Sequence, residues 1–388
     1  MGNSERRSPT LQLETMIGAP GAALRLPLGE WEAGIVTVLR EAFRFHFERN
    51  EFFRAQCDAN GVTPDDIVTR ADLPRVPLLP VSMFKRPDAH VLLTAPLNDI
   101  ELEIRSTGTG GVPSVARRDT ETVSRALIGI LSTYRDFFAL SKGAGLFLSP
   151  STAETPEMGM VKVFNLLNGF FDDHVYVVRD YAFDPEEAIE HLNRWHGEMT
   201  RHIIGPPFLV NRLLRFLELE EQSLKLDQDS MVITLGGWKR YTGESISRDE
   251  FDGKIEKYLG ITADRVRDMY GMIESNMLAV ECEHHRKHVP PWCYVSIRDV
   301  SDVDVELPVG ATGLIAILDA TNESYPGFLL SDDVGEADES PCPCGRNGQT
   351  VTFRRRRHGA ELGCCAVSIE KFIENKQIVA ECAIPEAE

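Results

Sequence analysis

Strand and helix patterns alternate through the middle of the chain, and this alternation is the feature that most limits the fold. Short apolar runs predict strands over 100–105, 145–148, 175–178, 202–204, 231–235 and 266–270. Between them, helices are predicted over 119–140, 184–196, 208–219 and 247–259. Strands that alternate with helices are typical of a largely parallel sheet, because each helix carries the chain back across the sheet. We therefore expect an α/β fold.

The two ends of the chain follow other patterns. The first 28 residues look loose, a helix is predicted over 31–57, and prolines predict an extended segment over 74–84. Towards the C-terminus, turns separate predicted strands at 294–297, 314–318 and 328–330, and a last helix is predicted over 367–375. These short strands favour a small β-rich subdomain beside the main α/β domain.

The charge of the chain limits its partners. A net charge of −19 leaves no excess of Lys and Arg for nucleic-acid phosphates or anionic membranes, so we expect neither partner. No apolar run approaches the roughly 18–20 residues that span a bilayer, and the first ten residues lead into no signal-peptide core. We expect a cytoplasmic protein, in which the eight cysteines are reduced thiols and some of them bind a metal.

A glycine-rich loop follows the predicted strand at 100–105 and precedes a predicted helix. Glycines allow main-chain N–H groups to approach phosphate oxygens, and hydroxyl groups add further donors. The loop lacks the lysine and the spacing of a Walker loop, and it does not follow the GxGxxG pattern. It predicts a phosphate site, with an ordinary flexible turn as the alternative. The residues assigned to this site are Ser106, Thr107, Gly108, Thr109, Gly110, Gly111 and Ser114.

Two further motifs stand at the ends of predicted strands. Gly236, Gly237 and Trp238 follow the strand at 231–235, and paired glycines beside an aromatic ring suit a flat base that rests on backbone. A plain strand-to-loop turn is the alternative. The second motif, Tyr-Gly-Met-Ile-Glu at 270–274, ends in a carboxylate, which offers the hard oxygen ligand that Mg²⁺ prefers.

These motifs resemble those of the adenylate-forming (ANL) superfamily, which includes acyl-CoA ligases and luciferase. The loop and the upstream segment 76–85 most resemble the acyl-protein synthetase (LuxE-like) branch and its relatives, the phenylacetate-CoA ligases. Gly110 and Ile273 depart from the pattern, since a hydroxyl residue is usual at both positions. Ser114 replaces a lysine that these two branches also commonly lack. The resemblance covers roughly residues 75–370.

The resemblance implies an ANL-type architecture and a role for each motif. A large adenylation domain would occupy 1–355, and a truncated C-terminal domain would occupy 356–388. Glu274 would help to hold Mg²⁺ on the phosphates of ATP. Asp333, rather than Asp332, would accept hydrogen bonds from the ribose hydroxyls, with an acidic loop as the alternative. The adenine would lie along Gly236, Gly237, Trp238, Tyr270, Gly271 and Met272.

A tight C-x-C turn near the end of the chain predicts half of a tetrahedral zinc site. The segment 282–288 contains one cysteine and three histidines and offers the other two ligands, with His284 and His285 as alternative fourth ligands. Phenylacetate-CoA ligase relatives resemble this layout. Four protein ligands leave no open position, so we expect a structural Zn²⁺ rather than a catalytic one. The predicted ligands are Cys282, His288, Cys342 and Cys344.

The resemblance also bears on the C-terminal tail. In this superfamily a mobile C-terminal domain carries a lysine that acts in adenylation, but here only 27 residues follow the segment 354–361. LuxE-like enzymes are similarly short and take the acyl group onto a cysteine near the C-terminus. Cys364 is the preferred candidate, before Cys365 and Cys382, with burial as small apolar side chains as the alternative. The arginine run at 354–357 would lower the pKa of such a thiol, and it forms either a solvated patch or a contact for an acidic partner.

We therefore predict an ATP-dependent enzyme that activates a fatty or aryl acid as acyl-AMP, releases pyrophosphate and passes the acyl group to a thiol or an amine. The acceptor could be Cys364, CoA or the phosphopantetheine of an acyl carrier protein. The alternative is a non-catalytic, zinc-stabilised binding protein that kept the fold, which Gly110 and Ile273 favour. A third interpretation is an enzyme whose lid another protein supplies. The expected cofactors are ATP, Mg²⁺ and structural Zn²⁺.

Overall fold

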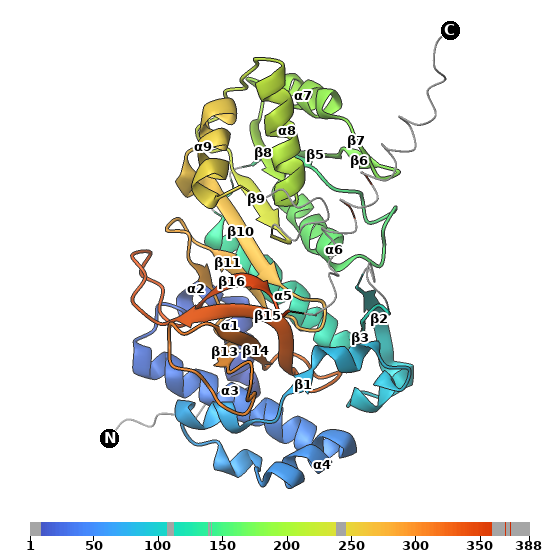
Figure 1. Cartoon of the computed structure of the whole chain (residues 1–388), viewed down its shortest axis with the longest axis vertical. Coiled ribbons are helices and arrows are strands. Elements are labelled where there is room, and N and C mark those ends of the chain that lie inside the picture. The colour runs from blue at the N-terminus through green and yellow to red at the C-terminus, as the bar shows by residue number, and fades with distance from the viewer. Residues whose placement is uncertain are drawn as a thin grey trace. The chain divides into compact units, whose positions relative to one another are not determined.

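The computed structural model describes residues 9–106, 112–138, 140, 142–237, 246–358, 369 and 373 (Figure 1). The chain divides into two compact units. Unit 1 consists of the described parts of Met1–Arg105, Val112–Phe138 and Gly271–Ala360. Unit 2 consists of the described parts of Ser106–Gly111, Ala139–Tyr270 and Glu361–Glu388. Each unit therefore combines segments that are far apart in the sequence.

Helices from the N-terminal part of the chain form one side of unit 1, coloured blue in Figure 1. The prediction of a loose N-terminus is wrong from residue 9 onward. Two short helices form there, and Ile17 of the first helix and Leu24, which caps the second, are buried because their apolar side chains pack into the core of unit 1. The helices of this unit are α1 (Pro9–Gly18), α2 (Pro20–Ala23), α3 (Leu28–Arg49), α4 (Glu51–Asn60) and α5 (Thr120–Phe137).

The sheet of unit 1 is built from the C-terminal strands. They pair in the order β13-β14-β15-β16-β12-β11, and neighbouring strands in this order are antiparallel. A short strand near the N-terminus, β1 (Leu79–Pro80), pairs with β15 in parallel. The predicted strands of the tail are thus confirmed as part of a larger sheet. The six strands are β11 (Leu278–Glu281), β12 (Lys287–His288), β13 (Cys293–Arg298), β14 (Gly313–Asp319), β15 (Phe328–Asp338) and β16 (Thr350–Arg356).

Aromatic side chains join these helices to this sheet. The Phe43 ring of α3 lies 5.8 Å from Phe53 of α4 and 6.1 Å from Phe328 of β15, both with edge-on geometry. All three side chains are completely buried. Burial of such rings contributes about 2–3 kcal/mol each, so the N-terminal helices depend on strands that lie nearly 300 residues later in the sequence.

The two strands that flank the glycine-rich loop pair with one another in unit 1. Strand β2 (Ile100–Arg105) pairs antiparallel with β3 (Val115–Asp119), and Arg105 lies opposite Val115. The helix predicted over 119–140 is confirmed as α5, and the unpredicted strand β3 lies between the loop and this helix. Helix α5 begins immediately after β3, where the Asp119 carboxylate accepts a hydrogen bond from the Thr122 N–H at 3.0 Å.

The proline-rich stretch is less extended than predicted. It contains the 3-10 helices Arg70–Arg75 and Val81–Lys85, on either side of β1. Proline fixes φ at a value that a 3-10 turn also uses, which explains why this stretch is compatible with both conformations.

Unit 2 is an α/β layer of the kind that the alternation predicts. Its strands pair in parallel in the order β10-β9-β8-β4-β5. Asp184 and Ser247 cap the helices α7 and α9, as their sequences predict. The strands are β4 (Gly143–Phe147), β5 (Asp173–Tyr176), β8 (Thr200–Ile204), β9 (Val232–Leu235) and β10 (Val266–Gly271). The helices are α6 (Gly159–Asn165), α7 (Pro185–Arg194), α8 (Pro207–Leu219) and α9 (Arg248–Leu259).

The α/β fold class is confirmed by this architecture. Among the described helices, none is both long and apolar enough to cross a bilayer. Most of the predicted helix at 367–375 lies outside the described residues.

Candidate active site and metal centre

Glu274 lies in unit 1, in the segment that joins β10 to β11. Its side chain is buried, and burial raises the pKa of its carboxyl group above the ordinary value. The Ser114 side chain donates a hydrogen bond to this carboxylate, and this bond lowers the pKa of Glu274. Ser114 is itself 2% exposed. The structure thus brings together two predicted site residues that are 160 positions apart in the sequence.

Two side chains that sequence reasoning missed hold the backbone around Glu274. One guanidinium nitrogen of Arg118 donates to the carbonyl oxygens of Ile273 at 2.7 Å and Ser275 at 3.1 Å. The Tyr325 hydroxyl donates to the Glu274 carbonyl oxygen at 2.9 Å. No motif or spacing in the sequence points to Arg118 or Tyr325. Only the packing of β3 and of the segment before β15 against this loop reveals their role.

Gly271 has a local reason to be glycine. A Cβ atom at this position would come within 2.8 Å of the Met277 carbonyl oxygen, on the far side of the same loop. The loop therefore folds back tightly on the end of β10, with Met272 half-buried beside it. This close approach explains the glycine of the Tyr-Gly-x-x-Glu motif in physical terms.

Asp333 and Arg356 form an ion pair in the β15–β16 hairpin. The two residues lie opposite one another in the ladder, and the Arg356 Nε lies 3.0 Å from an Asp333 carboxylate oxygen. The Asp333 side chain is 3% exposed, and its charge also contributes to the raised pKa of Glu274. Asp332 is less buried. Asp333 is thus the aspartate that lies near Glu274 and Ser114.

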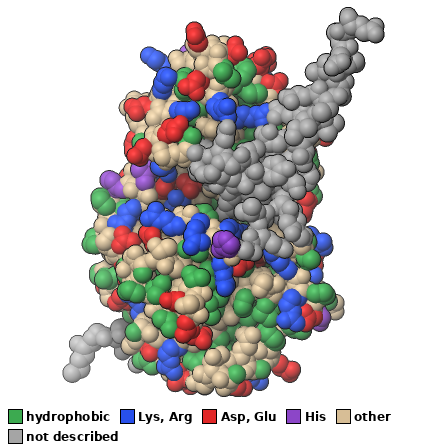
Figure 2. All heavy atoms as spheres, viewed as in Figure 1, with side chains coloured by type: hydrophobic (Ala, Val, Ile, Leu, Met, Phe, Trp, Pro, Cys, Tyr) green, Lys and Arg blue, Asp and Glu red, His purple; other side chains and the backbone are tan. Residues whose placement is uncertain are grey.

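The arginine run on β16 is divided by the alternation of the strand. Arg354 pairs with Glu336 at 2.8 Å on an exposed surface, whereas Arg356 pairs with buried Asp333. Arg355 and Arg357 are exposed. Figure 2 shows Lys and Arg side chains gathered over this hairpin. The expectation of a solvated arginine patch therefore describes only part of the run.

In unit 2, the glycine pair and the tyrosine lie at the ends of adjacent strands. Strands β9 and β10 are parallel, with Leu235 opposite Met269. Gly236 and Gly237 follow β9 at the same edge of the sheet at which Tyr270, the second-last residue of β10, lies. Both glycines have positive φ, 103° and 58°. The carboxyl edge of a parallel sheet is where α/β proteins bind their ligands.

The predicted zinc ligands lie together in unit 1. The ligand atoms of Cys282, His288, Cys342 and Cys344 all lie within 4.8 Å of one another. The sulfur atoms of Cys282 and Cys342 are 3.6 Å apart, and the Cys344 sulfur lies 3.3 Å from the His288 Nε2. Zn–S bonds of about 2.3 Å in a tetrahedron place two sulfurs about 3.8 Å apart. A disulfide would instead need about 2.05 Å, so the spacing fits a metal site.

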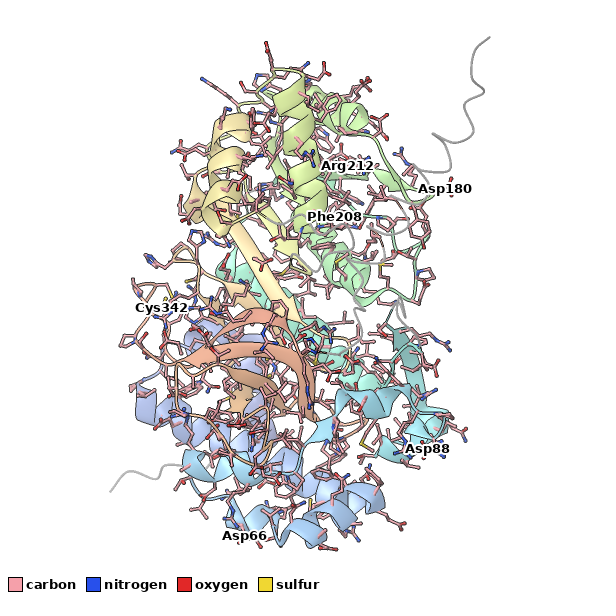
Figure 3. All side chains as sticks on the ribbon, viewed as in Figure 1. Asp66, Asp88, Asp180, Phe208, Arg212 and Cys342 are labelled. Atoms are coloured by element: carbon pink, nitrogen blue, oxygen red, sulfur yellow. The ribbon has the colours of Figure 1, made fainter. Side chains whose placement is uncertain are left out.

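The other two histidines of the segment point elsewhere. His285 lies beside Glu281, with 3.7 Å between the ring Nδ1 and a carboxylate oxygen, and His284 is exposed. Burial raises the pKa of Cys342 to about 12, so a bound cation would be needed to keep this thiol ionised at neutral pH. Figure 3 labels Cys342 at one side of unit 1.

Several predicted residues cannot be placed. Ser106, at the end of β2, is described, but most of the glycine-rich loop, the aromatic residue of the adenine motif and the cysteine proposed as acyl acceptor lie outside the described residues. These are Thr107, Gly108, Thr109, Gly110, Gly111, Trp238 and Cys364.

Comparison with known proteins defines first the class of this chain. It superposes on 2-hydroxyisobutyryl-CoA ligase bound to its acyl-adenylate and CoA with a TM-score of 0.64, which covers 85% of this chain and 76% of that one. At 15% identity, this likeness shows a shared fold. With the motifs at Ser114, Glu274 and Asp333, the fold is that of the adenylate-forming enzymes.

The family follows from sequence. The model of the LuxE acyl-protein synthetase family matches residues 32–373, so the chain belongs to this family. The long-chain-fatty-acid–luciferin-component ligase of Aliivibrio fischeri is 30% identical over 344 residues, or 87% of this chain and 88% of that protein. The ligase of the same description from Vibrio harveyi is 29% identical over the same shares. The expected resemblance is confirmed, and the chain is an adenylate-forming ligase.

Proposed function

We propose that this ligase activates a long-chain fatty acid with ATP and passes the acyl group to a thiol. The single observation that carries the proposal is the group formed by Ser114, Glu274, Asp333 and Arg356 in unit 1 of a LuxE-family chain. Two relatives that match over most of their length are ligases of long-chain fatty acids. They support the choice of fatty acids over aryl acids.

In the first step, a carboxylate oxygen of the fatty acid attacks the α-phosphorus of ATP. A P–O bond forms, the bond to the β-phosphate oxygen breaks, and pyrophosphate leaves with its electron pair. Residues 106–111 would hold the phosphates through backbone N–H groups, and Asp333 with Arg356 would hold the ribose. Gly236, Gly237 and Tyr270 would lie along the adenine. Most of the rate enhancement would come from positioning and charge stabilisation.

Glu274 fits a role as a magnesium ligand. Its carboxylate is buried beside a second carboxylate, Asp333, and a divalent cation would relieve the repulsion between them. Mg²⁺ held there would neutralise the charge of the phosphates. Ser114 would orient the Glu274 carboxylate through the hydrogen bond already present.

In the second step, a thiolate attacks the acyl carbonyl carbon, the bond to AMP breaks, and a thioester forms. Cys364 is the acceptor that we propose within this chain. A carrier protein or CoA could receive the acyl group afterwards. Incubation with ATP and a radiolabelled fatty acid should leave label on the denatured protein, and the Cys364→Ser variant should not retain it. Labelling that persists in Cys364→Ser but disappears in Cys365→Ser would move the acceptor site by one residue.

The Cys282–His288–Cys342–Cys344 cluster would hold a structural Zn²⁺, because it offers a complete Cys3His set without an open position. This metal would stabilise the fold and take no part in the reaction.

The test of the first step is pyrophosphate release with MgATP and a panel of fatty, aryl and amino acids, without an added acceptor. We expect release with fatty acids, and a loss of at least about a hundredfold in the Glu274→Gln variant. The matched control is Glu256→Gln, an exposed glutamate of α9, which should keep full activity. Release with aryl acids alone would reject the proposed substrate class, and undiminished release by Glu274→Gln would reject the role of Glu274.

A further inference from the structure

Asp319, at the end of β14, is a buried carboxylate that accepts hydrogen bonds from neutral groups. Its exposed fraction is 0%, and among the described residues the hydrogen bonds to its carboxylate come from neutral hydroxyl and backbone N–H donors. An isolated charge in the interior is costly unless hydrogen bonds replace its water shell. The surroundings of Asp319 therefore have to supply several donors, and they do so from three parts of the chain.

Both oxygens of the Asp319 carboxylate are saturated with donors. The Thr321 N–H at 2.9 Å and hydroxyl at 2.6 Å bond to Oδ1. The Ser275 hydroxyl at 2.9 Å and the Asn276 N–H at 2.8 Å bond to Oδ2. Cys293, which lies opposite Asp319 in the β13–β14 ladder, adds its thiol. An ionised carboxylate is acceptor-only and suits a site lined by donors, whereas an amide would turn two N–H donors towards other donors.

Two of these donors belong to the residues that directly follow Glu274. The Ser275 hydroxyl also accepts a hydrogen bond from the Met277 N–H at 3.0 Å, so Asp319 fixes a turn rather than a single side chain. On its other side, the same turn is held by Arg118 and Tyr325 through the carbonyl oxygens of 273–275. Asp319 holds the backbone after Glu274 from one side of the turn, and Arg118 and Tyr325 hold it from the other side.

We infer that Asp319 is a positioning residue for the Glu274 carboxylate: by anchoring 275–276 it sets the direction of the magnesium ligand, without touching metal or nucleotide. This inference rests on the proposed role of Glu274. Loss of a residue that orients a metal ligand typically costs 10–100-fold in metal affinity or activity. A residue that served stability alone would leave metal affinity unchanged in the folded variant.

The test measures metal binding without turnover. Mn²⁺ replaces Mg²⁺, ATP is present without a fatty acid, and electron paramagnetic resonance follows the Mn²⁺ bound to the protein–ATP complex. We expect Asp319→Asn to weaken Mn²⁺ binding by about tenfold or more, while ATP affinity measured without divalent cation stays at the wild-type value. The matched control is Asp136→Asn, which removes a carboxylate that accepts from the Gly21 N–H at 2.7 Å, away from the loop. It should bind Mn²⁺ as the wild type does.

Each outcome decides the inference. Wild-type Mn²⁺ affinity in folded Asp319→Asn, with affinity lost in Glu274→Gln, would overturn the role of Asp319 and leave the proposed function intact. Wild-type affinity in Glu274→Gln would overturn the magnesium site and the inference with it. If Asp319→Asn does not fold, Ser275→Ala removes one donor only and should weaken Mn²⁺ binding by about threefold, in line with one hydrogen bond. An unchanged affinity in Ser275→Ala would then overturn the inference.

Discussion

Two arginines of strand β16 test how burial changes the contribution of an ion pair to the free energy of unfolding. Arg356 pairs with Asp333, whose side chain is 3% exposed, whereas Arg354 is 55% exposed and pairs with Glu336. Arg356→Ala leaves a buried carboxylate without its partner, so we expect a loss of about 3 kcal/mol in the free energy of unfolding and a higher KM for ATP. Arg354→Ala should cost less than about 1 kcal/mol, since exposed pairs contribute little. Denaturant titrations of both variants measure the difference, and equal losses would show that burial does not distinguish the pairs.

A histidine of α3 makes the stability of the protein depend on pH. Burial lowers the pKa of His46 to about 4, and its ring bonds the Thr94 hydroxyl and the Asn322 carbonyl oxygen, both at 2.8 Å. The unfolded chain binds this proton near pH 6.5, so stability is complete above that pH. It is lost as pH falls towards 4, by about 3 kcal/mol in total. The charge of Arg49 lowers the pKa of His46, and the charge of Asp119 raises it.

The check is the slope of unfolding free energy against pH. The wild type should lose stability between pH 6.5 and 4, and His46→Gln, which cannot take up the proton, should lose about 3 kcal/mol less over this interval. Carboxylates that titrate in the same interval affect both proteins alike. Parallel slopes would contradict the prediction.

At the scale of elements, the turn that carries two of the cysteines connects three parts of unit 1. Arg346 donates to the Asp136 carbonyl oxygen of α5 at 2.8 Å, Asn347 bonds to the segment after α2, and Gln349 bonds to Val295 of β13. The cluster of Cys282, His288, Cys342 and Cys344, which we propose holds a metal, includes the first residues of this turn. Loss of the metal should therefore loosen the N-terminal helices as well as the turn itself.

We predict that His288→Ala and Cys344→Ser lose one equivalent of zinc and lower the Tm by several degrees, and that a chelator has the same effect on the wild type. Limited proteolysis should then cut within α1 and α2. The control is His284→Ala, which changes an exposed histidine of the same segment and should retain both zinc and stability. Zinc content measured by mass spectrometry decides the ligand set. If His284→Ala lost zinc and His288→Ala retained it, His284 rather than His288 would be the fourth ligand.

At the scale of the whole molecule, the two units differ in how the chain builds them. Unit 2 contains one long continuous segment, 139–270, whose parallel strands and helices are consecutive in sequence. Unit 1 needs segments from both ends of the chain, because the aromatic core around Phe43 is closed by Phe328. Because most of unit 2 comes from one continuous segment and unit 1 does not, we predict that only unit 2 can fold from a single fragment.

We expect the fragment 139–270 to show a cooperative thermal transition and α/β circular dichroism on its own. The fragment 1–138 should stay largely unfolded, because the strands that cover its buried helix faces are missing, and it should gain structure when 271–388 is added. Independent cooperative folding of 1–138 would contradict the division into these units.

Some of the predicted site residues lie together in the structure, and they belong to local motifs. Ser114 and Glu274 each stand in a short pattern whose chemistry is readable, and both lie in the same buried group. The four cysteine and histidine residues predicted as ligands also lie together. Arg118, Asp319 and Tyr325 were missed, because each acts through the backbone of a loop to which it is not adjacent in sequence. Nothing in local spacing encodes such contacts.

The sequence by itself determined the alternating strands and helices of unit 2, the capped starts of α7 and α9, and the class of chemistry. These features depend on periodicity, capping and motif composition, which act over a few residues. Only the tertiary structure decided that the first helices are ordered, that β3 follows the glycine-rich loop, and that Arg356 is an interior partner while Arg354 is not. These outcomes depend on burial against strands far away in sequence, and burial is a property of the packed molecule rather than of any local stretch.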